Sequence, residues 1–260
     1  MVTLLKLGGA AITDKDQPET LRPDALASIA ASLARATTTP LIIVHGAGSF
    51  GHLIAREYAL HEGLNSTDTH MQRGQLEAMV QLQRQLHTLN RHVVDALLAE
   101  NVPAWPVHPA SMCVLHNGRL AHLALEPIER ALAAGLVPVL YGDCVWDRAQ
   151  TFGIISGDQL MIYLADQLGA ARVGFGTNVP GVFDADDNVI PHMTREALST
   201  QQVGQSAARA DVTGGMRGKL AEIARLTHAE TSVWIFDILN AAQRDAFLRG
   251  DEALGTRITP

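Results

Sequence analysis

Short apolar runs alternate with amphipathic stretches along almost the whole chain. Six runs have the length and aliphatic composition of buried strands: Val2–Leu7, Leu41–Val44, Val102–Val107, Val137–Tyr141, Ala171–Phe175 and Ser232–Ile238. Between them the pattern predicts helices over Leu26–Ala36, Leu53–Tyr58, Thr69–Glu100, Glu126–Ala134, Ser156–Leu168, Gly218–His228 and Ala241–Arg249. Strands that alternate with helices predict an α/β fold with a mainly parallel sheet and helices on both of its faces.

Two hairpins are expected among these elements. Asn117-Gly118 predicts the turn of a hairpin over Pro109–His122, and Asp147–Gln150 predicts the turn of another over Cys144–Ile155. The sequence contains no internal repeat and no low-complexity linker, so we expect a single domain over residues 1–260. About residues 1–170 carry loops suited to small anions, and about residues 171–260 carry loops suited to a nucleotide.

Charge and composition exclude several classes of protein. The formal net charge of −7 argues against a nucleic-acid partner, whose phosphates favour a basic surface. No apolar run approaches the roughly 18–20 residues of a membrane span. Cys113 and Cys144 have no metal-ligand spacing, and two thiols do not indicate a secreted disulfide scaffold. No basic leader precedes Val2–Leu7, so we expect a cytoplasmic protein.

Five glycine-bearing loops lie at ends of the predicted elements. LGGA from Leu7, HGAGSFGH from His45, YGD from Tyr141 and GTN from Gly176 come at strand ends, and TGGM from Thr213 precedes the predicted helix that contains Lys219. Glycine lets backbone amides approach an anion closely, and a helix N-terminus adds partial positive charge. We therefore interpret His45–His52 as an amide cradle for a phosphate. Its GAGSFG string matches a dinucleotide fingerprint, but no acidic strand end follows about twenty residues later, which argues against a nicotinamide cofactor.

The basic residues are distributed unevenly. Of the 20 basic residues all but Lys6, Lys15 and Lys219 are arginine, and two of these three lysines lie close to glycine pairs. A compact ammonium group is the point charge that phosphate sites use. The three lysines are thus candidate phosphate ligands.

Three further side chains are candidates for the same site. His52 falls in the first turn of a predicted helix, where the helix end keeps the imidazole neutral and able to donate to a phosphate oxygen. Asp143 follows a strand end and is the candidate to position a lysine, whereas Asp158 reads as a first-turn acid that complements the helix dipole. The chain has no G-x-S-x-G elbow and no pair of acids spaced for hydrolysis.

Taken together, these motifs resemble a known family. KLGGAAITDK, HGAGSFGH, YGD, ISGDQ, GTNVPGVF, DVTGGMRGK and GTRI occur in the order found in the amino-acid-kinase superfamily. The pairing of KLGG-x-x-IT with HGAGSFGH resembles the isopentenyl phosphate kinases. The resemblance, from Lys6 to Ile258, implies an open αβα sandwich, a homodimer, and ATP-dependent phosphorylation of isopentenyl phosphate to isopentenyl diphosphate.

The resemblance also implies residue roles. Lys6 would neutralise the transferred phosphoryl group, Asp143 would orient Lys6, and Lys15 and Lys219 would hold the β- and γ-phosphates of ATP, which carry Mg²⁺. The acceptor phosphate would lie against Gly46, Ala47, Gly51, His52 and the Gly153 backbone. The nucleotide side would include Gly8, Gly9, Thr177, Gly181, Gly214 and Met216. No base is required, because an acceptor phosphate is already a nucleophile at neutral pH.

The chain departs from the family pattern at Ala10, where serine is common, and at Asn178 and Pro180, where aspartate is found. For the isoprenoid tail we expect a wall made by Met79, Leu82 and Leu86, although ordinary core packing explains their spacing equally well.

Three alternative functions remain open. A fosfomycin-type or other small phosphate or phosphonate kinase would share the cradle and the histidine. A carboxylate-accepting member, such as acetylglutamate or glutamate kinase, gives no reason for the histidine at the end of the acceptor loop. A non-catalytic nucleotide or anion sensor on the same fold would not need all three lysines.

Overall fold

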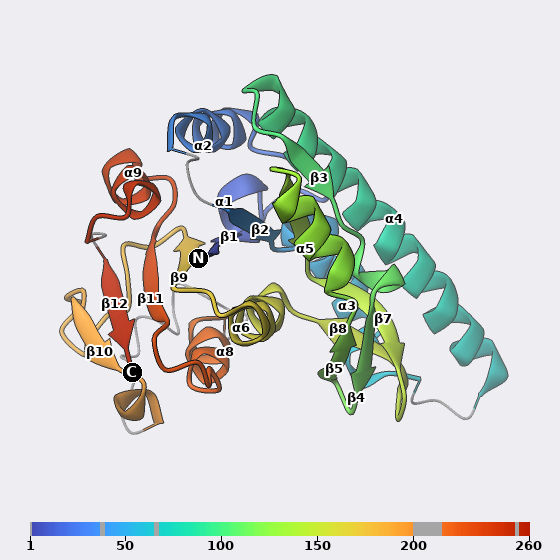
Figure 1. Cartoon of the computed structure of the whole chain (residues 1–260). Helices are drawn as coiled ribbons and strands as arrows, with labels where there is room; N and C mark the ends of the chain where they lie inside the picture. The colour runs from blue at the N-terminus through green and yellow to red at the C-terminus, as the bar shows by residue number, and fades with distance from the viewer. Residues whose placement is uncertain (1, 37–39, 65–67, 200–214, 253–254) are drawn as a thin grey trace.

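The first strand, β1 (Thr3–Leu7), lies in the middle of an eight-stranded sheet (Figure 1). A computed structural model describes the chain except for residues 1, 37–39, 65–67, 200–214 and 253–254. The strand order is β10-β12-β11-β9-β1-β2-β6-β3. The remaining strands of this sheet are β2 (Leu41–His45), β3 (Ala104–Pro106), β6 (Val137–Tyr141), β9 (Arg172–Thr177), β10 (His192–Thr194), β11 (Ser232–Asp237) and β12 (Thr256–Thr259).

The sheet is parallel at every pairing except that of β11 with β12. The prediction of a mainly parallel sheet is therefore confirmed. The pattern missed β10 and β12, which have three and four residues and contain one apolar side chain each, Met193 and Ile258. So short a segment has no hydrophobic run by which to recognise it, and its pairing depends on the neighbouring strands.

Helices cover both faces of this sheet, as predicted. One face packs against α2 (Pro23–Ala36), α4 (Thr69–Ala99) and α9 (Ala241–Arg249), in a core that includes Leu33, Val93 and Phe247. The other packs against α5 (Glu126–Ala133), α6 (Gly157–Leu168) and α8 (Gly215–Ile223). Since successive strand residues point to opposite faces, Leu4 joins the second core and Leu5 the first. The result is the three-layered αβα sandwich that the resemblance implied.

A smaller sheet, of order β5-β4-β7-β8, lies beside the long helix α4. Its strands are β4 (Cys113–His116), β5 (Arg119–Leu123), β7 (Asp143–Asp147) and β8 (Thr151–Ile155). Both predicted hairpins are present, and the carboxylate of Asp147 joins them by accepting the amides of Gly118 and Ala149, each at 2.7 Å. A third core fills the space between this sheet, α4 and α3 (His52–Glu57).

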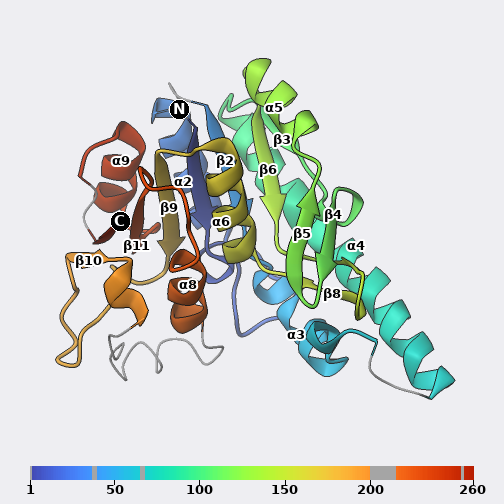
Figure 2. The ribbon, with the colours of Figure 1, turned by 60° about the horizontal axis from the view of Figure 1, so that its bottom comes forward.

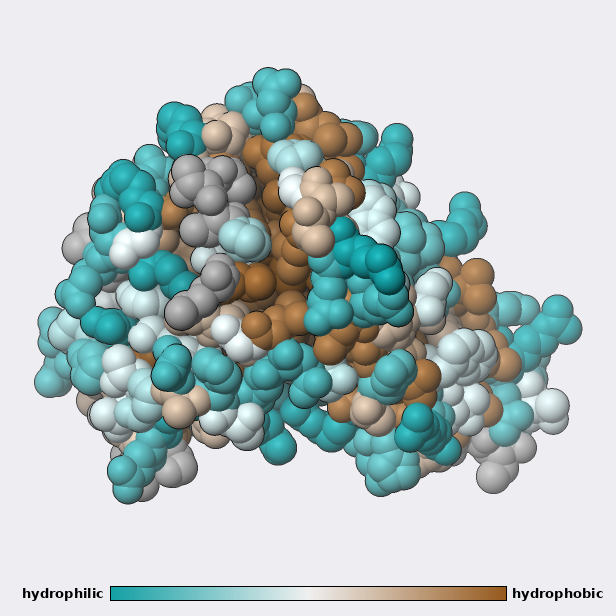
Figure 3. All heavy atoms as spheres, viewed as in Figure 1, coloured by the Kyte–Doolittle hydropathy of each residue, from teal (hydrophilic) through white to brown (hydrophobic). Residues whose placement is uncertain are grey.

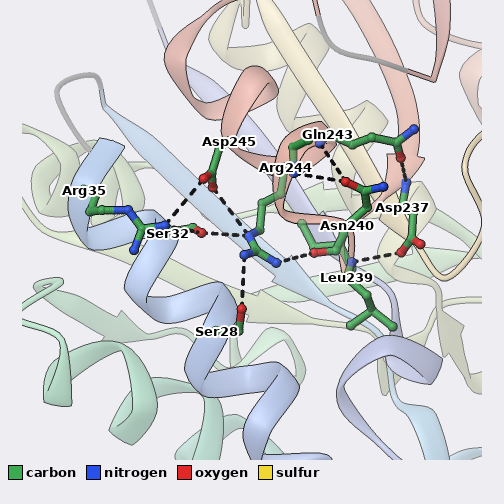
Figure 4. Close-up of polar contacts among 11 residues, drawn as sticks. Ser28, Ser32, Arg35, Asp237, Leu239, Asn240, Gln243, Arg244 and Asp245 are labelled. Carbon is green, nitrogen blue, oxygen red and sulfur yellow. Dashed lines mark hydrogen bonds and ion pairs between the residues drawn. The ribbon is translucent and has the colours of Figure 1, made fainter.

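A buried arginine joins the end of the chain to its beginning (Figure 4). Arg244 of α9 is 2% exposed and donates to the hydroxyls of Ser32 at 2.9 Å and Ser28 at 3.1 Å, both on α2. It also donates to the carbonyl of Ile238 at 2.8 Å, directly after β11. Every guanidinium nitrogen has an oxygen partner, which satisfies the requirement for burying a charged group.

One predicted helix has different ends. The pattern placed it over Gly218–His228, but α8 runs from Gly215 to Ile223. The carboxylate of Asp166 accepts the amides of Thr227 and His228, both at 2.8 Å, so these amides bind a side chain and do not continue the helix.

Candidate active site

Four central strands, β1, β2, β6 and β9, end at one edge of the sheet. In Figure 2 the arrows of β6 and β9 point the same way, toward the end of the molecule where α8 and α3 lie. Around β1 the strand order reverses, because β2 lies on one side of it and β9 on the other. Ligands in open α/β sheets bind outside such a point. Figure 3 shows the molecule in the view of Figure 1. On this face hydrophobic residues gather near the centre, and hydrophilic residues surround them.

At this edge two glycine loops pack backbone to backbone. The amide of Gly46 donates to the carbonyl of Leu7 at 2.9 Å, and the amide of Gly8 donates to the carbonyl of Gly176 at 2.8 Å. A Cβ atom on Gly9 would lie 2.4 Å from the nitrogen of Gly48, and one on Gly46 would lie 2.7 Å from the nitrogen of Gly9. Glycine is therefore required here by contact between the loops.

Thr13 adds a side-chain link between the same loops. Its hydroxyl donates to the carbonyl of Gly9 at 2.8 Å and accepts the amide of Ser49 at 3.0 Å. The sequence interpretation did not single out this residue, although it belongs to the quoted KLGGAAITDK motif. Thr13 is fully buried, so the hydroxyl is committed to holding the loops together.

The carboxylate of Asp158 binds two of the three lysines. Nζ of Lys6, on β1, donates to Oδ1, and Nζ of Lys219, on α8, lies 3.2 Å from Oδ1 and 3.3 Å from Oδ2. Burial acts to raise the pKa of Asp158, but the charges and hydrogen bonds of Lys6 and Lys219 outweigh it and lower the pKa to about 2. Two ammonium groups around one carboxylate leave one net positive charge at the carboxyl ends of the strands.

The start of α6 explains this arrangement. The side chain of Ser156 caps the helix by accepting the amide of Gln159 at 3.1 Å, which places Asp158 in the first turn. A Cβ atom on Gly157 would lie 3.2 Å from Cε of Lys6, so glycine lets the lysine side chain pass close to the helix.

The prediction that Asp143 orients Lys6 is wrong in this structure, because Lys6 binds Asp158. Asp143 begins β7, is 1% exposed, and accepts the amides of Cys144 at 2.8 Å and Ala110 at 3.2 Å. Burial raises its pKa to about 7 against the effect of these hydrogen bonds. Its role in the structure is to hold the second sheet to the segment before β4.

His45, the first histidine of the cradle motif, is completely buried. Its Nδ1 lies 3.1 Å from the carbonyl of Gly46, its Nε2 lies 3.2 Å from the side-chain nitrogen of Asn90 on α4, and its ring stacks on Tyr141. Burial lowers the pKa of His45 to about 4, so the imidazole is neutral at neutral pH. It then donates through Nδ1 and accepts at Nε2. The sequence interpretation assigned no role to His45 or Asn90, although His45 was within its motif.

The rest of the cradle leads into α3. A Cβ atom on Gly51 would lie 2.8 Å from that of Ala47 and 3.1 Å from Leu82, so this turn sits directly on α4. His52 is exposed at the first position of α3. Gly153 lies in β8, where an added Cβ would contact Leu115 at 3.2 Å.

Met79, Leu82 and Leu86 pack in the third core, each with at most 4% of its surface exposed. A cavity of about 330 Å³ is lined in part by Phe50, Gly51, Leu53 and Ile54. The tail-binding role of the three α4 residues stays a prediction.

The residues predicted for the nucleotide lie on several elements. Thr177 ends β9 and donates to the carbonyl of Val179 at 2.8 Å. Met216 and Lys219 are buried on α8. A Cβ on Gly181 would lie 2.7 Å from Oγ1 of Thr256, so packing explains this glycine. Lys15 is exposed on the loop after the short helix α1 (Gly9–Ile12), and Gly214 lies outside the described residues.

Comparison with known proteins decides the family. The model of the amino acid kinase family matches residues 1–237. The chain belongs to the amino acid kinase family. The prediction of membership in this superfamily, and with it of a kinase-family enzyme, is confirmed.

Curated family members similar to this chain include two isopentenyl phosphate kinases. That of Methanothermobacter thermautotrophicus is 37% identical, over 98% of both chains. That of Haloferax volcanii is 40% identical, over 86% of this chain and 88% of the relative. A crystal structure described as isopentenyl phosphate kinase superposes with a TM-score of 0.86 at 34% identity, over 99% of this chain and 100% of that one.

Two features are absent from the described part of this family member. Within the described ranges, no three His, Cys, Asp or Glu side chains are placed to hold a metal ion together. In the same part of the chain, no helix combines the length and apolar character needed to cross a bilayer.

Proposed function

We propose that this protein transfers the γ-phosphoryl group of ATP to the phosphate of isopentenyl phosphate, giving isopentenyl diphosphate and ADP. The observation that carries the proposal is the Lys6–Asp158–Lys219 cluster beside two interlocked glycine loops. The family membership and the names of relatives that align over almost the whole chain support this acceptor.

The lysine cluster supplies the charge that this reaction requires. Phosphoryl transfer depends mainly on positioning and on neutralising charge at the transferred group. Lys6 projects from the middle of the sheet and Lys219 from α8, so the two ammonium groups approach one point from different elements. In the proposal Lys6 contacts the transferred group, while Lys219 and Lys15 bind the β- and γ-phosphates. Asp158 is a positioning residue, since it holds both lysines and takes no part in the bonds that form and break during the transfer.

The cradle provides the acceptor side. Gly46, Ala47 and Gly51 would cradle the acceptor phosphate and the imidazole of His52 would donate to it, with the Gly153 backbone nearby. An oxygen of this phosphate attacks the γ-phosphorus, and the bond from that phosphorus to the bridging oxygen of ADP breaks. Because a phosphate oxygen is already anionic at neutral pH, no residue is needed to remove a proton.

Mg²⁺ would be carried by the ATP phosphates and would neutralise part of their charge. This fits the chemistry of the described residues, since Asp158 is paired with two lysines and Asp143 is buried among amides. Gly8, Gly9, Thr177, Gly181, Gly214 and Met216 would belong to the nucleotide side. In this scheme about residues 1–170 bind the acceptor, and about residues 171–260 bind the nucleotide.

Two further properties are part of the proposal. We expect a homodimer, as the resemblance implies, and a cytoplasmic enzyme. Light scattering at two protein concentrations tests the first, and fractionation of the source cells tests the second.

Conversion of ATP to ADP with a panel of acceptors tests the function. The panel contains isopentenyl phosphate, dimethylallyl phosphate, fosfomycin, acetylglutamate and no acceptor. Turnover with the two isoprenoid phosphates, at rates well above the others, supports the proposal. Preference for fosfomycin would replace the acceptor and leave the lysine roles in place. ATP binding without turnover on any acceptor would favour a non-catalytic sensor.

A further inference from the structure

An ion pair connects the two parts of the chain close to Lys219. Nη1 of Arg119 lies 2.5 Å from Oε1 of Glu222, and Nη2 lies 2.8 Å from Oε2. Arg119 begins β5 in the hairpin, and Glu222 is on α8, three residues after Lys219. Such a two-pronged pair fixes both the distance and the orientation of its partners.

The arginine projects from a well-anchored hairpin. At the turn, Asp147 accepts the amides of Asn117 at 3.2 Å and Gly118 at 2.7 Å. Gln159 of α6 holds the same turn from the other side, since its Oε1 accepts the amide of Leu120 and its Nε2 donates to the carbonyl of Gly118 at 3.3 Å. Gln159 is adjacent to Asp158, so the hairpin is tied to the helix turn that binds Lys6 and Lys219.

We infer that Arg119 and Glu222 are positioning residues that fix α8 against the hairpin, so that Nζ of Lys219 stays at the carboxylate of Asp158. Residues three apart on a helix lie on one face, so the ion pair at Glu222 also fixes the position of the face that carries Lys219. The Glu222 side chain is 15% exposed, and that of Arg119 is 43% exposed. The partial burial of Glu222 and the two-pronged geometry distinguish this contact from isolated surface pairs, which contribute little.

This inference rests on the proposed function for its kinetic readout. The phosphate ligand that it concerns is the nucleotide, because Lys219 lies on the nucleotide side of that proposal. Loss of the pair is expected to change the KM for ATP and to leave the KM for the acceptor unchanged. Loss of a residue that merely stabilised the fold would not change the KM for ATP while leaving the KM for the acceptor unchanged.

The test is a charge-reversal cycle with Arg119→Glu, Glu222→Arg and the double exchange. Each single variant is expected to raise the KM for ATP by roughly threefold to a hundredfold, the range of coupling found for contacting residues. The double exchange is expected to recover most of this loss. The matched control is Arg130→Glu, which breaks an arginine–glutamate pair of similar length, 2.6 Å, on the exposed face of α5. This control is expected to leave the KM for ATP unchanged.

Single variants with a wild-type KM for ATP would overturn the inference, as would a double exchange no better than the single changes. If a reversed charge prevents folding, Arg119→Gln and Glu222→Gln replace the reversals, and the double Gln variant must then raise the KM for ATP no more than either single variant. Hydrogen exchange of the amides of Gly215–Ile223 separates this inference from the proposed function. Faster exchange in the single variants, restored in the double, supports the pair even if no acceptor is turned over. Unchanged exchange in the single variants contradicts it.

Discussion

Asp158 and Lys219 lie on different helices, yet the Nζ atom of Lys219 is 3.2 Å from Oδ1 and 3.3 Å from Oδ2 of the carboxylate. Lys6 binds Oδ1 of the same carboxylate from the central strand. One carboxylate therefore sets the spacing of two cations that would otherwise repel each other. The pKa of Asp158, lowered to about 2, keeps it ionised throughout the range in which enzymes are assayed.

Asp158→Asn is expected to lower kcat by about two to three orders of magnitude, as for the loss of a charged group that organises a transition state. The amide keeps the shape of the side chain but removes the charge that holds the two lysines together. Steady-state kinetics with ATP and isopentenyl phosphate provide the measurement. Asp166→Asn is the matched control, because Asp166 lies on the same helix and binds only the amides of Thr227 and His228 among the contacts described. A kcat within twofold of wild type for Asp158→Asn contradicts the positioning role.

His52→Ala is expected to raise the KM for the acceptor by about tenfold or more, the effect of losing a hydrogen bond to a charged group. The affinity for ATP should change much less, because His52 starts α3, at the end of the cradle motif. Titration calorimetry with each substrate separates the two effects. His61→Ala, a change at another exposed histidine nearby, serves as the control. Equal losses for acceptor and ATP would remove His52 from the acceptor site.

Gly9→Ala is expected to lower the free energy of unfolding by about 1–3 kcal/mol. The added methyl group meets the backbone of Gly48 at 2.4 Å, so the two glycine loops must separate. Gly74→Ala is the contrasting variant, because at this helical position the nearest atom to an added Cβ, on Tyr58, is 3.9 Å away. It is expected to stabilise the protein by roughly 0.5–1 kcal/mol. Denaturant unfolding of both variants checks the pair, and equal stability of the two would contradict the packing of the loops.

His45 makes stability depend on pH in the acidic range. Its pKa is lowered by burial to about 4, so between pH 6.5 and 4 the unfolded chain binds a proton that the folded chain does not. The stability contributed at neutral pH, about 3 kcal/mol, is therefore lost as the pH falls through this window. His45→Gln removes the titration, so the free energy of unfolding should fall less steeply below pH 6.5 than in wild type.

The comparison must be made between variant and wild type, because Asp143 acts in the opposite direction. Its pKa is raised to about 7, so the stability it contributes is lost as the pH rises. Denaturant unfolding at several pH values between 4 and 7.5 gives both slopes. Parallel slopes for wild type and His45→Gln would show that His45 is not buried as a neutral group.

The two acidic residues show how far sequence alone could go. Asp143 and Asp158 each follow a glycine near a strand end or a helix start, and the sequence interpretation preferred Asp143 as the residue that positions a lysine. The choice is made by tertiary structure. Asp143 begins β7, and its carboxylate accepts hydrogen bonds from the amides of Cys144 and Ala110. The cap at Ser156 instead directs Asp158 toward the central strand.

Other parts of the site were predictable because the signal was local. Lys6 lies near the end of an apolar strand and the glycine loops come directly after such ends, which parallel strands bring together at one edge. His45 and Asn90 are 45 residues apart, and their contact depends on how α4 crosses the sheet. No spacing rule connects them, so the sequence interpretation could not pair them.

The most direct test of the central claim is the ³¹P NMR spectrum of a reaction that contains the protein, ATP, Mg²⁺ and isopentenyl phosphate. Transfer between phosphates predicts that the acceptor's single resonance is replaced by the two coupled resonances of a diphosphate, in an amount equal to the ADP formed. Formation of ADP with inorganic phosphate alone, or an unchanged acceptor resonance, would contradict the account.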